Sequence, residues 1–177
     1  MGIGQLGAPN IIIKRKFRWT LQIQAGPFYV PEYYVKAAAR PNLEIDELEL
    51  NFLNSVAWTA GKAKWQPITV RYIDVTDQVM GPLWSWISTI YSLTQPQLCS
   101  QSEPAGYMGN AMLNLYDGCG TTLESWLLQG VWPKSVNFGD LAYSDNEEVN
   151  IELSLRYNAV QYKGSCGPSP QSTCTGC

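Results

Sequence analysis

The clearest pattern in the chain is a strict alternation of apolar and polar residues near its end. From Val149 to Tyr157 every second residue is apolar, and polar residues such as Ser154 occupy the positions between. A period of two predicts a β-strand with one buried face and one face toward solvent or a partner. A Gly130–Pro133 corner and an acidic turn over 143–148 precede this strand. The whole block is typical of β structure and has no feature of a catalytic site.

Shorter alternating segments bounded by turn residues predict further strands. They lie at residues 17–24, 33–39, 68–73, 110–117 and 123–128. Together with the terminal strand and the segment described next, they predict a mainly β, antiparallel sandwich or barrel-like subunit with one α-helix.

The segment from residue 43 to residue 52 changes its pattern in the middle. Its apolar residues fall on odd positions up to Ile45 and on even positions from Leu48 to Phe52. Because alternation cannot change faces without an inserted residue or a bend, we predict a β-bulge or sharp bend at Asp46-Glu47. A helix is the alternative, since Leu and Glu favour helices. The small, polar residues 54–66 are expected to be flexible, and residues 68–73 to return as a strand, so that the region forms a long hairpin with an extended tip.

One helix is predicted after the hairpin. Asp77 or Gly81 is its expected cap, Pro82 suits its first turn, and Pro96 lies beyond its end. Its apolar stripe over 83–91 is wide, which indicates that the helix packs on a sheet and also contacts something else. Packing explains its two tryptophans better than a cofactor role.

Composition excludes several classes of function. The chain has no histidine, which removes Ser-His-Asp and Cys-His catalysis and histidine metal sites. We therefore predict no enzyme activity, no catalytic residue, no cofactor and no metal site. Charged residues make up 15% of the sequence, against about 25% in typical domains. Seven Trp and ten Tyr on a chain with so little charge favour an oligomer, because these side chains suit interfaces.

The charge pattern gives no sign of nucleic-acid or membrane binding. The net charge is −3, and the one basic run, Lys14 to Lys16, is interpreted as a solvated strand entry. No segment is long and apolar enough to span a bilayer. The first residues have their charges after their apolar residues, the reverse of a secretory signal, so we expect the chain to be made and kept in the cytoplasm.

Carboxylates cluster at residues 44–49 and again at 145–148. Paired carboxylates could bind a cation or hydrolyse a glycoside, but neither cluster has the spacing of a calcium loop. We interpret them as a solvated strand face and a turn.

The five cysteines do not form a zinc pattern, because the one CxxC, at 174–177, has no second pair. An odd number leaves one thiol free or bonded to another chain. Cytoplasmic thiols stay reduced, whereas those of a particle outside the cell could oxidise.

The order of these elements resembles the tail tube protein of contractile-tailed bacteriophages. The matching motifs are FRWTLQI at 17–23, WQPITV at 65–70, LWSWI at 83–87, GVWP at 130–133 and GDL at 139–141 with the acidic turn and final strand. The resemblance divides the chain into an N-terminal arm (1–15), a tube domain (16–162) and a Cys/Gly/Pro-rich tail (163–177). The order of the motifs is more specific than any one motif, and neither the arm nor the tail matches the family.

The resemblance implies a structural virion protein, assembled in the host cytoplasm. Six subunits would form a ring with one continuous β-barrel, and rings would stack into a hollow tube inside a contractile sheath for genome delivery. The implied partners are the chain itself, the sheath, the baseplate and the tail terminator. Tape measure protein and genomic DNA would pass through the lumen without specific binding, and the chain would not insert into a membrane.

Roles for individual residues follow from that implied assembly. Contacts between subunits or rings are expected at Trp58, Lys62, Trp65, Trp84 and Trp86. The lumen is expected to be lined by Glu44, Glu49 and Arg71, or else by Asn150, Glu152 and Arg156. An acidic lumen would repel phosphates and let DNA slide. Disulfides within or between subunits are expected from among Cys99, Cys119, Cys166, Cys174 and Cys177.

Two other functions remain open. A pyocin or secretion-system inner tube would share the fold and have no DNA cargo. A carbohydrate-binding β-sandwich would use the tryptophans to stack on sugars, and it would be a monomer.

Overall fold

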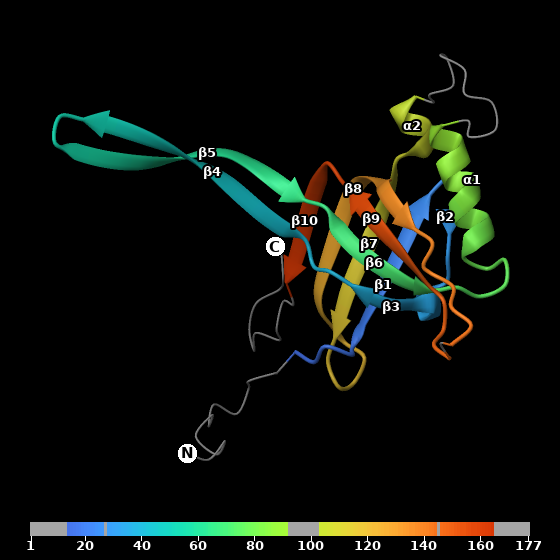
Figure 1. The fold of residues 1–177 in the computed structure, drawn as a ribbon. Helices are drawn as coiled ribbons and strands as arrows, with labels where there is room; N and C mark the ends of the chain where they lie inside the picture. The colour runs from blue at the N-terminus through green and yellow to red at the C-terminus, as the bar shows by residue number, and fades with distance from the viewer. Residues whose placement is uncertain (1–13, 27, 92–102, 145, 165–177) are drawn as a thin grey trace.

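The computed structural model describes residues 14–26, 28–91, 103–144 and 146–164. These residues form a mainly β structure with two α-helices and one 3-10 turn (Figure 1). The strands are β1 (Trp19–Ala25), β2 (Phe28–Tyr29), β3 (Val35–Ala38), β4 (Asn42–Phe52), β5 (Ser55–Gln66), β6 (Ile68–Ile73), β7 (Gly109–Tyr116), β8 (Thr122–Asn137), β9 (Asn150–Arg156) and β10 (Ala159–Gly164). The helices are α1 (Met80–Ile90) and α2 (Pro104–Tyr107), and the 3-10 turn is η2 (Glu32–Tyr34).

The body is an antiparallel sheet in the order β2-β1-β7-β8-β9-β6-β3, with β10 also paired to β8. The long strand β8 belongs to two halves of this sheet. Its first half pairs with β7 and β10, and we call β2, β1, β7, this half of β8 and β10 sheet I. Its second half pairs with β9, and we call that half together with β9, β6 and β3 sheet II.

Gly130 is the point where β8 passes from sheet I to sheet II. Its φ of +65° lies in the left-handed region that favours glycine, and a Cβ there would lie 2.6 Å from Nδ2 of Asn158. Asn158 is where β9 gives way to β10 on the opposite strand. The predicted corner is therefore confirmed: it is a bend in β8 that carries this strand from sheet I into sheet II.

The core lies between the inner faces of the two sheets. Leu21 and Ile23 of sheet I and Val70 and Leu153 of sheet II are at most 3% exposed, as their alternation predicts. Burying a side chain of this size fully stabilises the fold by about 1.5–3 kcal/mol.

Helix α1 contributes to the same core through Leu83 and Trp86, both fully buried. The Trp86 ring stacks on Phe28 of β2, with 4.6 Å between ring centroids. Its Nε1–H donates to the carbonyl of Tyr107 at 2.7 Å, which fixes α2 against α1. Neither described helix is long and apolar enough to cross a membrane.

The bulge predicted in the hairpin is confirmed, although the extra residue lies in the opposite strand. Between two aligned pairs, β4 advances from Ile45 to Glu47 while β5 advances from Ala63 to Ala60. Residues 55–66, expected to belong to the hairpin tip, form β5, which pairs with β4 along its whole length, so β5 and not the strand at 68–73 is the return strand of the hairpin. The helical alternative for residues 43–52 is excluded, since β4 is a strand.

Several predicted details differ from the structure. No side chain caps α1: its N-cap position is Val79, and Asp77 lies in the preceding turn at a φ of +55°. Gly81 and Pro82 both lie in the first turn of α1, as expected for Pro82. The count of one helix is wrong because α2 forms where a loop was expected, and β10 was not predicted. Pro96 lies outside the described residues.

Candidate assembly surfaces

The hairpin of β4 and β5 is a separate two-stranded sheet that projects away from the body (Figure 1). No residue from 42 to 52 or from 55 to 66 is buried. An isolated two-stranded hairpin is at best marginally stable in water. The hairpin is therefore a surface that the described part of this chain leaves uncovered.

The far half of this hairpin has apolar side chains on both faces. Leu50 pairs with Ala57 on one face, and Trp58 pairs with Glu49 on the other. At the tip, Leu53 is 92% exposed. The exposed apolar residues of the hairpin are Leu43, Ile45, Leu48, Leu50, Phe52, Leu53, Val56 and Trp58. Large exposed apolar residues gathered in one segment are typical of a protein interface.

Among the described residues, the hairpin has one ion pair, near the body, and carboxylates without an ion-pair partner farther out. Lys64 Nζ lies 2.6 Å from Asp46 Oδ2, and this hydrogen bond together with the carboxylate charge raises the pKa of Lys64. The described residues give Glu47 and Glu49 no ion-pair partner. The far half of the hairpin is therefore both apolar and acidic.

Sheet I has two edges that the described strands leave largely unpaired. At one edge, β2 pairs with Gln24 and Ala25 and leaves the rest of β1 open. At the other edge, β10 pairs with β8 alone. Because unpaired edges present rows of N–H and C=O groups, they readily pair with a strand of another chain.

The free N–H groups of β10 can be identified from the register. The carbonyl of Gln129 accepts from the N–H of Asn158, so Gln129 faces β10. Gln129 is aligned with Ala159. Backbone groups alternate in direction along a strand, so the N–H groups of Val160 and Tyr162 point away from the sheet.

The outer face of sheet I is polar and almost without charge. One aligned row crosses it as Gln22, Met112, Leu127 and Gln161. The two neighbouring rows are Gln24, Asn110, Gln129 and Ala159, and Thr20, Asn114, Ser125 and Lys163. Lys163 is the one charged residue in these rows, and Glu32 reaches the rim, where its carboxylate accepts from Gln22 Nε2 at 3.2 Å.

The outer face of sheet II is charged, and it holds most of the residues predicted to line a lumen. Arg71 of β6 pairs with Glu152 of β9 at 3.2 Å. Asn150 and Arg156 lie on the same face of β9 by their parity. Glu44 and Glu49 do not join them, because β4 belongs to the separate two-stranded sheet, where their parity places them on opposite faces. Of the first set predicted to line the lumen, only Arg71 therefore lies on this face, together with the whole of the second set.

The residues predicted at subunit contacts differ in exposure. Trp58 is 61% exposed, and Lys62 is exposed at the bulge. Trp65 is half-buried at the base of the hairpin, 6.1 Å from the ring of Tyr157. Trp84 is half-exposed on α1. Trp86 needs correction: it is fully buried in the core and has no surface to offer a neighbour.

An apolar groove of about 370 Å³ runs between α1 and the second half of β8. On its rim the rings of Trp84 and Phe138 lie 6.3 Å apart. It is lined by Trp84, Ile87, Ile90, Tyr91, Pro133, Lys134, Ser135, Val136 and Phe138. The wide apolar stripe of α1 predicted a contact in addition to the one with the sheet. Nothing in the sequence predicted that Phe138 lies beside the helix.

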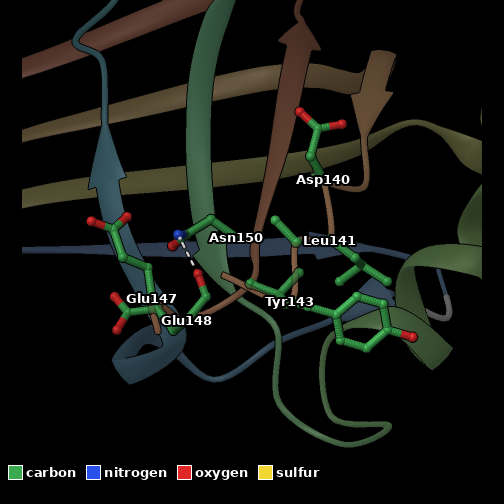
Figure 2. A pocket seen from close by; sticks show the side chains of 9 residues that line it. Asp140, Leu141, Tyr143, Glu147, Glu148 and Asn150 are labelled. Atoms are coloured by element: carbon green, nitrogen blue, oxygen red, sulfur yellow. Dashed lines mark hydrogen bonds between the residues drawn. The ribbon is translucent and has the colours of Figure 1, made fainter. Parts of the chain in front are cut away.

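The acidic turn between β8 and β9 forms a second pocket, of about 520 Å³ (Figure 2). Asn150 Nδ2 donates to the carbonyl of Glu148 at 2.9 Å. The Glu148 carboxylate pairs with Lys36, and this contact lowers its pKa. A general acid would need a raised pKa instead. Leu141 and Tyr143 extend into solvent, so the turn is a surface loop as interpreted.

No group of three His, Cys, Asp or Glu residues in the described part of the chain could hold a metal ion. Cys119 is an exposed free thiol in the turn between β7 and β8. The other four cysteines lie outside the described residues, so the expected disulfides stay a prediction.

Glu124 is a buried carboxylate that the sequence gave no reason to single out. It is 3% exposed and pairs with Lys14 and with Arg40, the latter at 2.9 Å. Burial raises its pKa, but the bonds from Lys14 and Trp126 and the charge of Arg40 outweigh burial and lower it. These contacts attach the segment before β1 and the base of the hairpin to sheet I. Lys14 is therefore more than a solvated residue at a strand entry.

Comparison with known sequences finds nothing. No model of a protein family matches the chain, and no curated protein matches it.

Solved structures do match, over nearly the whole chain. A chain of the PVC sheath–tube complex of an extracellular contractile injection system is similar with a TM-score of 0.66 and 17% identity, covering 93% of this chain and 99% of that one. A chain of the PVC sheath/tube terminator gives 0.67 and 18%, covering 89% and 100%. A chain of the anti-feeding prophage tube-terminating cap gives 0.66 and 17%, covering 91% and 99%. The likeness is one of fold, and it agrees with the fold that the resemblance implied.

Proposed function

We propose that the chain is a structural subunit of the inner tube of a contractile injection particle. The observation that supports this most strongly is the pair of unpaired edges on sheet I, in a fold shared with chains of sheath–tube assemblies. The projecting hairpin adds a second surface that a monomer leaves uncovered.

In this proposal the β10 edge of one copy pairs with the β1 edge of the next. The two edges differ, so the contact is heterologous, and repeating it closes a ring if the rotation fits. Ring closure then removes every exposed edge of sheet I. If each of six copies contributes β1, β7, β8 and β10 to the barrel, without the two-residue β2, the ring would have roughly 24 strands. With about 4.8 Å between strands and a tilt of about 40°, the barrel would be about 48 Å across at its backbone.

The lumen would be lined by the outer face of sheet I, because sheet II covers the inner face. This assignment replaces both predicted lumen sets. Arg71, Asn150, Glu152 and Arg156 would then face outward, toward a sheath. A wall of amides and hydroxyls lets cargo slide through weak, replaceable hydrogen bonds, and it does not depend on the electrostatic repulsion that an acidic lumen would supply.

The tube would work with a sheath around it and with a baseplate and a terminator at its ends. The similar chains come from PVC and anti-feeding prophage particles, so an extracellular injection system is one setting for such a tube. A phage tail tube, with genomic DNA and tape measure protein in its lumen, is the other member of the class. Nucleic acid in the purified particles would distinguish the two, and particles without it would exclude the phage tail.

Val160 gives a test of the ring contact. Val160→Pro removes an N–H that points away from the sheet, whereas Val160→Ala removes the same half-buried side chain and keeps the N–H. We expect rings or tubes by electron microscopy from the wild type and Val160→Ala, and folded monomers from Val160→Pro. A wild-type monomer at every concentration would contradict the tube, and sugar binding by that monomer would support the carbohydrate-binding alternative.

A further inference from the structure

We propose that the apolar groove between α1 and β8 is the socket for the hairpin tip of a neighbouring copy. This inference rests on the tube function and goes beyond it, because it names both surfaces of a second contact between subunits.

The groove is open to solvent and has the lining of a protein contact. Trp84 and Tyr91 are 47% and 44% exposed, and Phe138 is 38% exposed. Aromatic side chains on a groove rim can bury a large area against a partner at little entropic cost. At about 370 Å³ the groove is near the lower end of ligand pockets, about 300–1,000 Å³. This size suits a few side chains better than a large ligand.

The hairpin tip offers matching chemistry. Phe52 and Leu53 are 72% and 92% exposed, at the turn where the ribbon ends. Behind them Glu47 and Glu49 have no ion-pair partner among the described residues. The groove has one charged lining residue, Lys134, and no acidic one. Apolar residues would thus meet apolar residues, and the carboxylates would meet a lysine at the rim.

The two surfaces lie on opposite sides of the body. Figure 1 shows the hairpin leaving on the side of β10, while α1 lies on the side of β2. A hairpin strand of 11 residues extends for about 36 Å at about 3.3 Å per residue. It therefore points away from the groove of its own chain and toward the groove of a copy placed beside β10. This is the same side as the proposed pairing of β10 with β1, so the same neighbouring copy would make both contacts.

Photo-crosslinking tests the contact directly. Phe52 is replaced by p-benzoylphenylalanine in the full chain, and Tyr33, equally exposed at 72% but on η2, is replaced in a matched control. Rings or tubes of the purified variant are irradiated, and the crosslinked peptides are identified by mass spectrometry. We expect crosslinks from position 52 to residues 84–91 or 133–138 of another copy, and none to those residues from position 33.

The reciprocal variant, with the crosslinker in place of Phe138, is expected to reach residues 50–58 of another copy. Assembled rings whose position-52 crosslinks map elsewhere would overturn the socket and leave the tube function standing. A chain that stays monomeric and gives no crosslink between copies would overturn both.

Discussion

The strands of the body and the far half of β4 share an alternation of apolar and polar residues, and they differ in what covers them. In the body, Leu153 of β9 is fully buried against the opposite sheet. In the hairpin, Leu50 of β4 is 50% exposed and Trp58 of β5 is 61% exposed. Alternation therefore specifies a strand and its apolar face, but it does not say whether the covering surface belongs to the same chain.

This difference divides the stability of the chain into two parts. The body has a closed core and a helix packed on it, so it can fold alone. The hairpin has one ladder of hydrogen bonds and no core, so it needs a partner to hold its apolar residues. We therefore expect the body to fold first and the apolar residues of the hairpin to be buried only on assembly. The ordering of the hairpin then depends on contact with the neighbouring copy.

The largest expected effect lies in the body. Leu153→Ala removes a fully buried side chain and should lower the free energy of unfolding by about 2–5 kcal/mol. Urea denaturation of dilute subunits, followed by tryptophan fluorescence, measures this change. A loss below about 1 kcal/mol would mean that the two sheets do not pack as described.

The parts of the fold that follow from sequence are those with a strong local pattern. The terminal strand is confirmed by β9 at 150–156, and the change of parity near Asp46 is confirmed by the bulge. β5 was missed because its alanines and lysines have little preference for strands, and its pairing with β4 decides its conformation. β10 was missed because its alternation is short, with Val160 and Tyr162 separated by Gln161 and followed by Lys163, and because its pairing with β8 decides its conformation.

The candidate surfaces were harder to predict than the strands. Trp58 was identified as an exposed contact residue, which its exposure permits, whereas Trp86 was assigned to an interface and is in the core. Both tryptophans lie in segments rich in apolar residues, and sequence does not tell which side of a helix meets its own sheet. The groove needs Trp84 and Phe138 together, and these residues meet through the packing of α1 on β8.

A smaller effect is expected at Glu124, which joins the base of the hairpin to the body through Arg40. Glu124→Gln removes the charge that Lys14 and Arg40 face, and it should lower the free energy of unfolding at neutral pH by about 1–3 kcal/mol. Glu152→Gln is the matched control, because its pair with Arg71 is exposed and should contribute less than about 1 kcal/mol.

The pH dependence of this effect has a defined sign. The pKa of Glu124 is lowered in the folded protein from its ordinary 4.5, so its contribution is complete above that value and is lost as pH falls through the folded pKa. The difference between wild type and Glu124→Gln should therefore shrink in acid below about pH 4.5. A difference that stayed constant from pH 7 to pH 3 would contradict the ion-pair account.

The smallest effect on folding is expected in the hairpin. It tests whether the hairpin, unlike the body, is covered only by another copy. Leu50→Ser alters a side chain that is half-exposed in the subunit, so dilute monomers should unfold within about 0.5 kcal/mol of the wild type. The same change should raise the concentration needed for assembly by about tenfold, because losing about 1.4 kcal/mol of buried contact costs that factor. Analytical ultracentrifugation across a dilution series measures the assembly. Since Leu153→Ala acts on folding and Leu50→Ser on association, a Leu50→Ser variant that assembled normally would show that the hairpin remains uncovered in the tube.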